Sequence, residues 1–272
     1  MAITTLDGVI AGFQPPAPLV KNGGSMAAAG GMRGYTPWYV SGSPGASVAT
    51  AIGVNGEACV PALGTSVAGR IPRTDPATLN AYVGRLAMNS SGPGSLWLID
   101  RLWQNSGLLT TSITAQAMTP AALPARSGDG TINGANVMAG VEWSATGGAG
   151  TPTVNLTYTN QAGTAGQTAA MTGVSAPNLG TVEIFSLAAG DTGIRSVQSF
   201  IQSATRTSGT MHLMLFRLLA TLDVTAANIG NAIDALTSGM PRVYNGSCLQ
   251  LLWFPTTATG VNLIGSYVET QG

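Results

Sequence analysis

Residues 137–145 read Val-Met-Ala-Gly-Val-Glu-Trp-Ser-Ala, and residues 153–160 read Thr-Val-Asn-Leu-Thr-Tyr-Thr-Asn. In the first run Val, Ala, Val, Trp and Ala alternate with Met, Gly, Glu and Ser, and in the second Val, Leu and Tyr alternate with Thr and Asn. This period of two is typical of a β-strand with one buried face. The segment between them, Thr-Gly-Gly-Ala-Gly-Thr-Pro, supplies the backbone freedom for a reversal of the chain. We therefore predict an antiparallel strand pair over residues 137–160, around which the rest of the chain is organised.

Strand patterns separated by Gly-, Ser- and Asn-rich turns occupy most of the chain after residue 78. Residues 95–104 are apolar on both faces, which indicates a central strand covered by other layers. Asp100 and Arg101 interrupt this run, and we expect them near a rim or an intersubunit contact. Many short strands with regular turns favour an antiparallel β-sandwich or jelly-roll-like body over residues 79–272. The expected strands are residues 82–88, 95–104, 108–114, 137–145, 153–160, 167–171, 181–187, 194–204, 210–222, 244–254 and 260–269.

One short helix is predicted near the C-terminus, at about residues 226–237. Thr225 is a suitable N-cap, and Ile229, Ile233 and Leu236 share one helical face. Gly239 follows as a stop signal.

The first 78 residues form a different kind of segment, because Pro and Gly recur throughout it. We expect an extended and largely irregular N-terminal arm. Aromatic residues would anchor this arm on a surface, either that of its own domain or that of a neighbouring subunit, and the sequence leaves both open. These interaction residues are Phe13, Tyr35, Trp38 and Tyr39.

The charge content is low. Only 8% of the residues are charged, with eleven basic and eleven acidic side chains and a net charge of zero. Ordinary soluble domains carry roughly 25% charged residues, and neutrality favours association. We expect a subunit embedded in an assembly, or a surface built from Thr, Ser, Asn, Gln and Gly. A hydrophobic share of 44% argues against disorder of the main body.

Targeting signals are not evident in the sequence. No uninterrupted apolar run approaches the roughly 20 residues of a membrane-spanning helix, and the first twelve residues lack the pattern of a signal peptide. We expect a product that is made in the cytoplasm, is not secreted and has no membrane partner. Cys59 and Cys248 are then expected to be reduced packing thiols, with a single bridge between them as the alternative.

Residues suited to catalysis are few. His212, the only histidine, lies in an apolar strand and is predicted to be packed rather than to act as a base. A single imidazole also excludes histidine-based metal sites. The eleven carboxylates are scattered, which gives little support to a glycosidase pair. Glu142 lies on the polar side of its strand and is expected to be solvated or paired.

Binding motifs are equally sparse. The loop with Asp129, Asn133 and Asn136 offers one carboxylate, whereas calcium takes six to eight oxygens, so we predict a plain turn. No Gly-rich stretch pairs with a lysine as a phosphate loop requires. Arg70 and Arg73 are the densest basic pair, which is too little for a nucleic-acid surface. We predict a protein that is not an enzyme and has no cofactor, no metal, no small-molecule substrate and no nucleic-acid partner.

Five short segments point to one kind of protein. They are Met-Ala-Ile-Thr-Thr-Leu-Asp-Gly at 1–8, Asp-Arg-Leu-Trp-Gln-Asn-Ser-Gly at 100–107, Gly-Thr-Pro-Thr at 150–153, Tyr-Thr-Asn-Gln-Ala-Gly-Thr-Ala-Gly at 158–166 and Gly-Asp-Thr-Gly-Ile-Arg-Ser at 190–196. They resemble virion structural proteins of tailed bacteriophages. The resemblance covers most of the chain, and it implies a non-enzymatic virion component that is assembled in the host bacterial cytoplasm.

Three hypotheses follow for the place of such a component. The first is a capsid decoration or cement protein that binds the major capsid protein lattice, stabilises the head and forms a homo-oligomer, for which we expect a trimer. The second is a tail, neck, collar or fibre-associated protein. The third is a host-glycan-binding module in which Trp97, Trp103 and Trp143 stack on sugars, although tryptophans at strand positions more often belong to the core.

Overall fold

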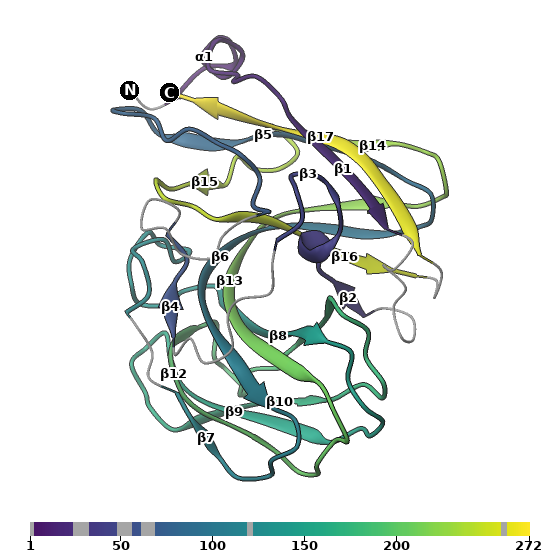
Figure 1. Ribbon diagram of the computed structural model, residues 1–272. Helices are drawn as coiled ribbons and strands as arrows, with labels where there is room; N and C mark the ends of the chain where they lie inside the picture. The colour runs from purple at the N-terminus through teal and green to yellow at the C-terminus, as the bar shows by residue number, and fades with distance from the viewer. Residues whose placement is uncertain (1–2, 24–32, 48–55, 61–68, 119–121, 257–259) are drawn as a thin grey trace.

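The computed structural model describes residues 3–23, 33–47, 56–60, 69–118, 122–256 and 260–272 (Figure 1). The chain is mainly β, and all its strand pairs are antiparallel within the described residues. The prediction of a mainly β, antiparallel fold is therefore confirmed. Residues 24–32, 48–55 and 61–68 of the expected N-terminal arm lie outside the described residues.

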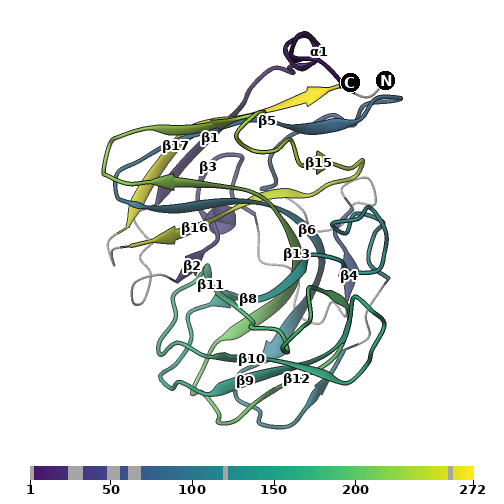
Figure 2. The same ribbon diagram turned by 180° about the vertical axis from the view of Figure 1, so that it is seen from behind.

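Two long strands form the spine of the molecule. β6 (Gly94–Leu109) and β13 (Thr210–Val224) pair with each other along their lengths and curve through both halves of the structure (Figures 1 and 2). Three register shifts interrupt the pairing. Such bulges increase the local twist and bend a strand, so the same two strands serve more than one layer.

The spine strands close a barrel. β13 pairs with β8 on one side and with β6 on the other, and the order continues from β8 through β11, β2 and β16 back to β6. The short β4 pairs with β6 outside this ring, and the 3-10 helix η1 follows β2. The bounds are β2 (Gly34–Tyr35), η1 (Pro37–Tyr39), β4 (Glu57–Ala58), β8 (Val137–Ala145), β11 (Thr181–Ile184) and β16 (Leu249–Pro255).

A six-stranded sheet covers one half of the spine. Leu96, Leu222 and Trp253 from the barrel strands share a buried apolar cluster with Leu86 and Leu263 from this sheet. Helix α1 lies at the far end of the sheet, beside both chain termini (Figure 1). The bounds are α1 (Leu6–Ala11), β1 (Ala17–Gly23), β3 (Gly42–Ser43), β5 (Ala81–Ser90), β14 (Asn231–Asp234), β15 (Arg242–Val243) and β17 (Val261–Gln271).

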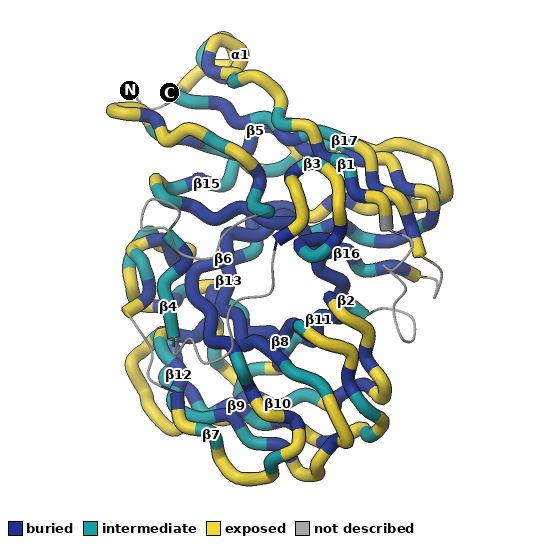
Figure 3. The backbone as a smooth tube through the Cα atoms, viewed as in Figure 1, coloured by how far each residue is buried: buried dark blue, intermediate teal, exposed yellow. Residues whose placement is uncertain are grey.

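A four-stranded sheet covers the other half. Its side chains and those of β6, β8 and β13 form a second apolar cluster. A third cluster, with Ile99, Met214, Phe216 and Leu252, lies inside the barrel. The middle parts of β6 and β13 are buried, as the dark blue tube in Figure 3 shows. The bounds are β7 (Gln116–Ala117), β9 (Thr153–Asn160), β10 (Gln167–Thr172) and β12 (Ile194–Gln202).

The predicted strand pair over residues 137–160 is wrong in its pairing. β8 and β9 are both strands, but β8 pairs with β11 and β13, whereas β9 pairs with β10 and β12. Val141 and Trp143 on β8 pack with Leu156 and Tyr158 on β9 in one cluster. The two strands therefore lie in facing layers, and the glycine-rich segment between them crosses from one layer to the other.

The predicted C-terminal helix at residues 226–237 is also wrong. β14 occupies part of this range and pairs with β5 at the edge of the six-stranded sheet. Asn228 has a left-handed φ of 60°, and Gly230, two residues further on, weakens a helix further. Ile233 packs on the core between the sheets, so tertiary contacts replace the helical face. In the described residues the α-helix is α1, which lies near the N-terminus.

The turn expected at residues 105–107 is a bulge. β6 continues to Leu109, so the separate strand predicted at 108–114 does not form. Leu108 pairs with Met211 and Asn105 pairs with Leu213, which leaves an extra residue on β6. Gly107 has a φ of 73° at this point. A glycine in that conformation inside a strand is the mark of a bulge rather than of a chain reversal.

The N-terminal segment contains more regular structure than expected. β1 pairs with β17 over its whole length and with β3 on its other side. β2 and β4 belong to the sheet that forms the barrel. The leading residues therefore contribute strands to two of the three sheets.

Candidate functional site

Four polar side chains meet inside the barrel, and we call them the barrel cluster: Tyr39, Arg101, Glu142 and His212. Glu142 on β8 and His212 on β13 are direct cross-strand partners, so the sheet register alone places them together. Arg101 comes from β6, on the other side of β13. Tyr39 comes from η1. The cluster joins segments that are far apart in the sequence.

Glu142 is the centre of the barrel cluster. Its carboxylate accepts a hydrogen bond of 2.8 Å from Arg101 Nη1 and another of 2.8 Å from Tyr39 Oη. His212 Nδ1 lies 3.8 Å from Glu142 Oε1. The Arg101 guanidinium also stacks over the Trp38 ring, 4.8 Å from its centroid. Hydrogen bonds and a cation–π contact thus surround a fully buried ion pair.

The protonation states follow from burial and from this ion pair. Burial alone raises the pKa of Glu142, but the Arg101 charge and the hydrogen bonds from Arg101 and Tyr39 outweigh it and hold the pKa below its usual range. Burial lowers the pKa of His212 to about 4, and the Glu142 carboxylate offsets only part of this effect. Burial and Glu142 raise the pKa of Tyr39 well above its ordinary value. At neutral pH the cluster therefore contains an ionised Glu142 and a neutral His212.

The barrel cluster is closed to substrates. Arg101, Glu142 and His212 are each 1% exposed. A general base must reach the proton that it abstracts, and burial keeps a substrate away from all three of these side chains. The prediction of a packed His212 is confirmed. Glu142 was expected to be either solvated or paired, and the structure shows it paired with Arg101.

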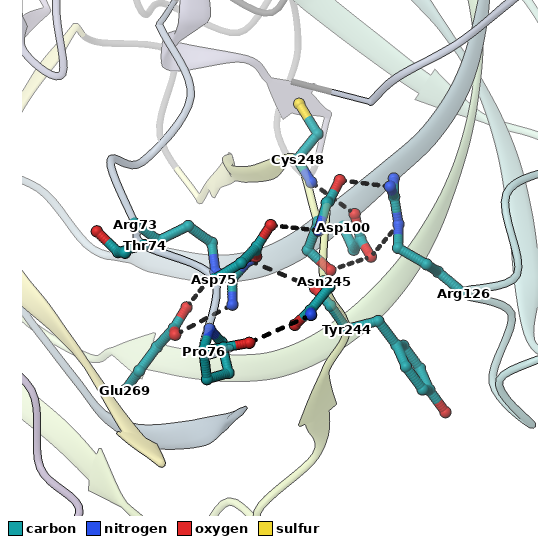
Figure 4. A network of polar contacts seen from close by, with 12 residues as sticks. Arg73, Thr74, Asp75, Pro76, Asp100, Arg126, Tyr244, Asn245, Cys248 and Glu269 are labelled. Carbon is teal, nitrogen blue, oxygen red and sulfur yellow. Dashed lines mark hydrogen bonds and ion pairs between the residues drawn. The ribbon is translucent and has the colours of Figure 1, made fainter. Parts of the chain in front are cut away.

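A second network is built on Asp100 (Figure 4). Asp100 accepts hydrogen bonds from Arg126 Nε at 3.2 Å, Ser247 Oγ at 2.8 Å and the backbone N–H of Cys248 at 2.9 Å. Arg217 Nη2 lies 3.7 Å away. Asp100 is 0% exposed. The expected rim position of Asp100 and Arg101 is therefore wrong, since both are buried in the interior of a single chain.

The same view shows a neighbouring ion pair between Arg73 and Glu269 (Figure 4). Arg73 Nε donates to one oxygen of Glu269 at 2.6 Å, and Arg73 Nη2 donates to the other at 3.2 Å. Arg73 Nη1 also contacts Asp75, whose second oxygen accepts from the N–H of Gly246 at 2.9 Å. This network ties β17 to the loop that precedes β16.

A cleft of about 410 Å³ opens beside this ion pair. Pro15, Pro16 and Pro72 form part of its wall, and Arg73 and Glu269 contribute to its lining. Every side-chain nitrogen of Arg73 already donates a hydrogen bond within the protein. A ligand in this cleft would therefore meet proline rings rather than a free guanidinium.

A third polar group is built on Glu183, a buried residue of β11. Glu183 accepts hydrogen bonds from Trp143 Nε1 at 3.1 Å and from the N–H of Val174 at 3.1 Å, and Arg33 lies 3.8 Å away. Burial raises the pKa of Glu183. A shifted carboxyl beside a depression, here of about 470 Å³, is a feature of functional sites. Because both oxygens of Glu183 are engaged by the protein, its evident role is to hold Trp143 and Val174.

The interior holds an unusual share of the charge. Of the eleven basic and eleven acidic side chains, nine are buried. Charged residues are almost never buried unless they are paired, and most of these belong to the networks above. The surface of the chain is therefore even poorer in charge than the sequence indicates. The nine are Lys21, Asp100, Arg101, Arg126, Glu142, Glu183, Arg206, Arg217 and Glu269.

The four aromatic residues proposed as arm anchors lie mostly inside the chain. Tyr35 is 1% exposed and Trp38 is 5% exposed. Tyr39 is bonded to Glu142, and Phe13 alone is substantially exposed, at 43%. The structure thus brings Trp38 and Tyr39 to the barrel cluster, whereas Tyr35 pairs with β11 and β16.

Two of the three tryptophans considered for sugar stacking are fully buried, and the third, Trp97, is partly buried. Trp103 and Trp143 are 0% exposed, and Trp97 stacks on Phe254 with ring centroids 4.4 Å apart. Trp103 and Trp143 therefore cannot stack on a sugar as the glycan hypothesis requires. Asp129 closes a turn by accepting hydrogen bonds from the N–H and Oγ1 of Thr131.

The two cysteines are free and buried. They share a small cluster with Trp38. Burial raises the pKa of Cys59 to about 12 and also raises that of Cys248. Among the described residues, no three His, Cys, Asp or Glu side chains gather as a metal site.

Sequence reasoning missed Arg126, Arg217 and Arg206 as buried groups. Each guanidinium is engaged: Arg126 and Arg217 contact Asp100, and Arg206 stacks over Trp143 at 4.9 Å. For Arg217 a signal was present, because a charge inside an apolar strand demands a partner.

No family model matches this chain, and searches of curated proteins and of solved structures also return no match. Within the part of the chain that the structure describes, no helix has the length and apolar character needed to cross a membrane.

Proposed function

We propose that this chain is a non-enzymatic structural subunit of a bacteriophage virion, acting as a decoration or cement protein on the major capsid protein lattice. The observation that carries the proposal is the distribution of charge: nine charged side chains are buried, and much of the surface is neutral. A free monomer normally covers itself with charges of both signs. A subunit that neighbours cover has no such need.

The outer face of the six-stranded sheet is the surface best suited to be covered. Ile264 on β17 is 59% exposed, and its cross-strand neighbours are Val20 and Asn89. Along the same face Ser266 pairs with Ala87. These side chains are uncharged, and the charge that the face does carry, on Arg85 opposite Val268, lies beside the opposite charge of Asp234 on β14. Each Å² of apolar surface buried there would contribute about 25 cal/mol before the costs of association.

Contact through this face is favoured over strand addition at the sheet edge. At the edge strand β14, Asp234 pairs with Arg85 across the strands. The N–H of Ala232 donates to the Asn231 side chain, and the N–H of Asp234 donates to Thr237 Oγ1. Side chains thus occupy donors that an added strand would use, which is a known protection of sheet edges.

The test compares particles made with and without this protein. We expect particles without it to assemble but to release their genome at lower temperature or milder osmotic stress, and purified protein added back should restore the loss. Quantifying the protein per particle separates the two virion locations. Hundreds of copies support the shell, whereas a few to a few dozen would move the protein to the tail, neck or collar. Unchanged particle stability would contradict the cement role.

A matched pair of variants tests the surface itself. Ile264→Asp introduces a charge on the outer sheet face, and we expect it to abolish binding to particles while leaving the thermal unfolding midpoint nearly unchanged. Ile132→Asp makes the same change at an isoleucine that is 46% exposed in a loop, and it should bind like the wild type. Equal binding of both variants would exclude this face. Sedimentation of the purified protein measures its oligomeric state, and we expect a trimer.

A further inference from the structure

Lys21 is the only lysine of the chain. It belongs to β1, and its side chain is buried, at 3% exposure. Its Nζ donates hydrogen bonds to the carbonyl oxygens of Val40 at 3.0 Å and Pro44 at 2.6 Å. Among the described residues, no carboxylate lies within the 4.0 Å ion-pair distance of Nζ. A buried ammonium without a counter-charge is costly, so this group demands an explanation.

A small cavity adjoins Lys21 and is also lined by Gln250. The centre of a water-sized sphere can occupy about 10 Å³ of this cavity, which is room for one small particle. Gln250 is 3% exposed, and neither Nε2 nor Oε1 has a hydrogen-bond partner. Buried amides are almost always bonded. Two independent features, a lone cation and an unpartnered amide, therefore line the same cavity.

The chemistry of the lining selects the occupant. Lys21 has three N–H donors and uses two of them on carbonyl oxygens, and Gln250 Nε2 offers further donors. A metal cation is repelled by the ammonium, and an oxyanion such as sulfate or phosphate exceeds the space. A water molecule would satisfy hydrogen bonds but leave the charge uncompensated. A monatomic anion accepts hydrogen bonds from the third N–H of Lys21 and from Gln250 Nε2, and it neutralises the ammonium.

We propose that Lys21 and Gln250 bind a single halide ion, chloride under physiological conditions. The ion would join three segments: β1, the loop after η1 that contains Val40 and Pro44, and β16. Halide binding would therefore hold the N-terminal strand on the barrel. The site is independent of the proposed virion role, because it lies inside one chain.

The single lysine allows a direct experiment. Burial lowers the pKa of Lys21 to about 8. Protein labelled with ¹³C at lysine Cε gives one side-chain signal, and its titration is compared in sodium chloride and in sodium gluconate at equal ionic strength. Because a bound anion favours the charged ammonium, we expect chloride to make Lys21 hold its proton about tenfold more tightly. Identical titrations in the two salts would overturn the proposal.

Three variants and an anomalous scatterer, bromide, complete the test. Gln250→Leu keeps the lysine but removes the amide donor, and we expect the chloride effect to fall to within error. Lys21→Met should abolish the difference in unfolding midpoint between the two salts, whereas Arg195→Gln, which removes an exposed cation, should retain it. Crystals grown in bromide should show an anomalous peak between Lys21 and Gln250. A water molecule there with no anomalous signal would contradict halide binding, and the wild-type titration decides the matter if Lys21→Met fails to fold.

Discussion

His212 and Glu142 face each other across two neighbouring strands inside the barrel, with Nδ1 of the histidine 3.8 Å from Oε1 of the glutamate. The carboxylate forms an ion pair with Arg101, from which it accepts a hydrogen bond of 2.8 Å. Burial of the imidazole therefore prevails over the attraction of the carboxylate, and burial lowers the pKa of His212 to about 4. His212 is therefore neutral at pH 7, although it lies beside a glutamate.

This neutral histidine makes the fold sensitive to acid. In the unfolded chain His212 has an ordinary pKa of about 6.5, so between pH 6.5 and pH 4 the unfolded state binds a proton that the folded state excludes. Stability is fully present above pH 6.5 and falls by about 3 kcal/mol as the pH drops to 4. Urea unfolding at pH 7.0, 6.0 and 5.0 measures this slope. His212→Gln cannot titrate, and it should flatten the slope in the range above the carboxylate pKa values.

Removing one partner of the ion pair in the barrel is expected to lower the free energy of unfolding more than replacing both partners by apolar residues. Glu142→Gln leaves the Arg101 charge buried and unpaired, so we expect a loss of about 3–5 kcal/mol in the free energy of unfolding. Replacing both residues by Met removes both charges and should recover most of that loss. Chemical denaturation of the two variants checks this. A double variant as unstable as the single one would contradict the account, and Arg195→Gln on the surface serves as the neutral control.

The sequence was sufficient to recognise strands but not their neighbours. Alternation in residues 137–145 and 153–160 identified β8 and β9, because period two follows from the strand backbone itself. Alternation reports which face is buried and not what lies beside the strand. Val141 and Leu156 do face one core, and the pattern of two facing layers is the same as that of a hairpin.

The polar networks could not be predicted for a related reason. Asp100 and Arg101 are adjacent in the sequence, yet Asp100 bonds to Arg126 whereas Arg101 bonds to Glu142. The pairing of β6 with β13 contains a register shift directly beside Arg101. A bulge re-aims side chains, and its partners come from distant segments. Adjacent charges in an apolar strand therefore indicated a special position, but the interior was not among the expected places.

Gly94 tests the joint between β6 and β16. A Cβ at this position would lie 2.5 Å from a ring carbon of Trp253 and 2.6 Å from the carbonyl oxygen of Phe254. Gly94→Ala therefore forces two paired strands apart, and we expect a loss of about 1–3 kcal/mol, as in other overpacked sites. At Gly45 a Cβ meets nothing within 4 Å, so Gly45→Ala should leave stability nearly unchanged. Comparing the two unfolding midpoints checks the contact, and equal midpoints would contradict it.

The thiols of Cys59 and Cys248 should be inert in the native protein. Burial raises the pKa of Cys59 to about 12 and raises that of Cys248 as well, and only the thiolate attacks a disulfide reagent. We expect an aromatic disulfide reagent to label neither cysteine in the folded chain at pH 7, and to label both in guanidinium without any reductant. Native labelling should be slower than that of an unfolded thiol by roughly a hundredfold or more. Because both sulfurs are free in the structure, fewer than two reactive thiols in the denatured, unreduced protein would reveal a bridge and contradict this arrangement. Cys248→Ala leaves one thiol to count and calibrates the assay.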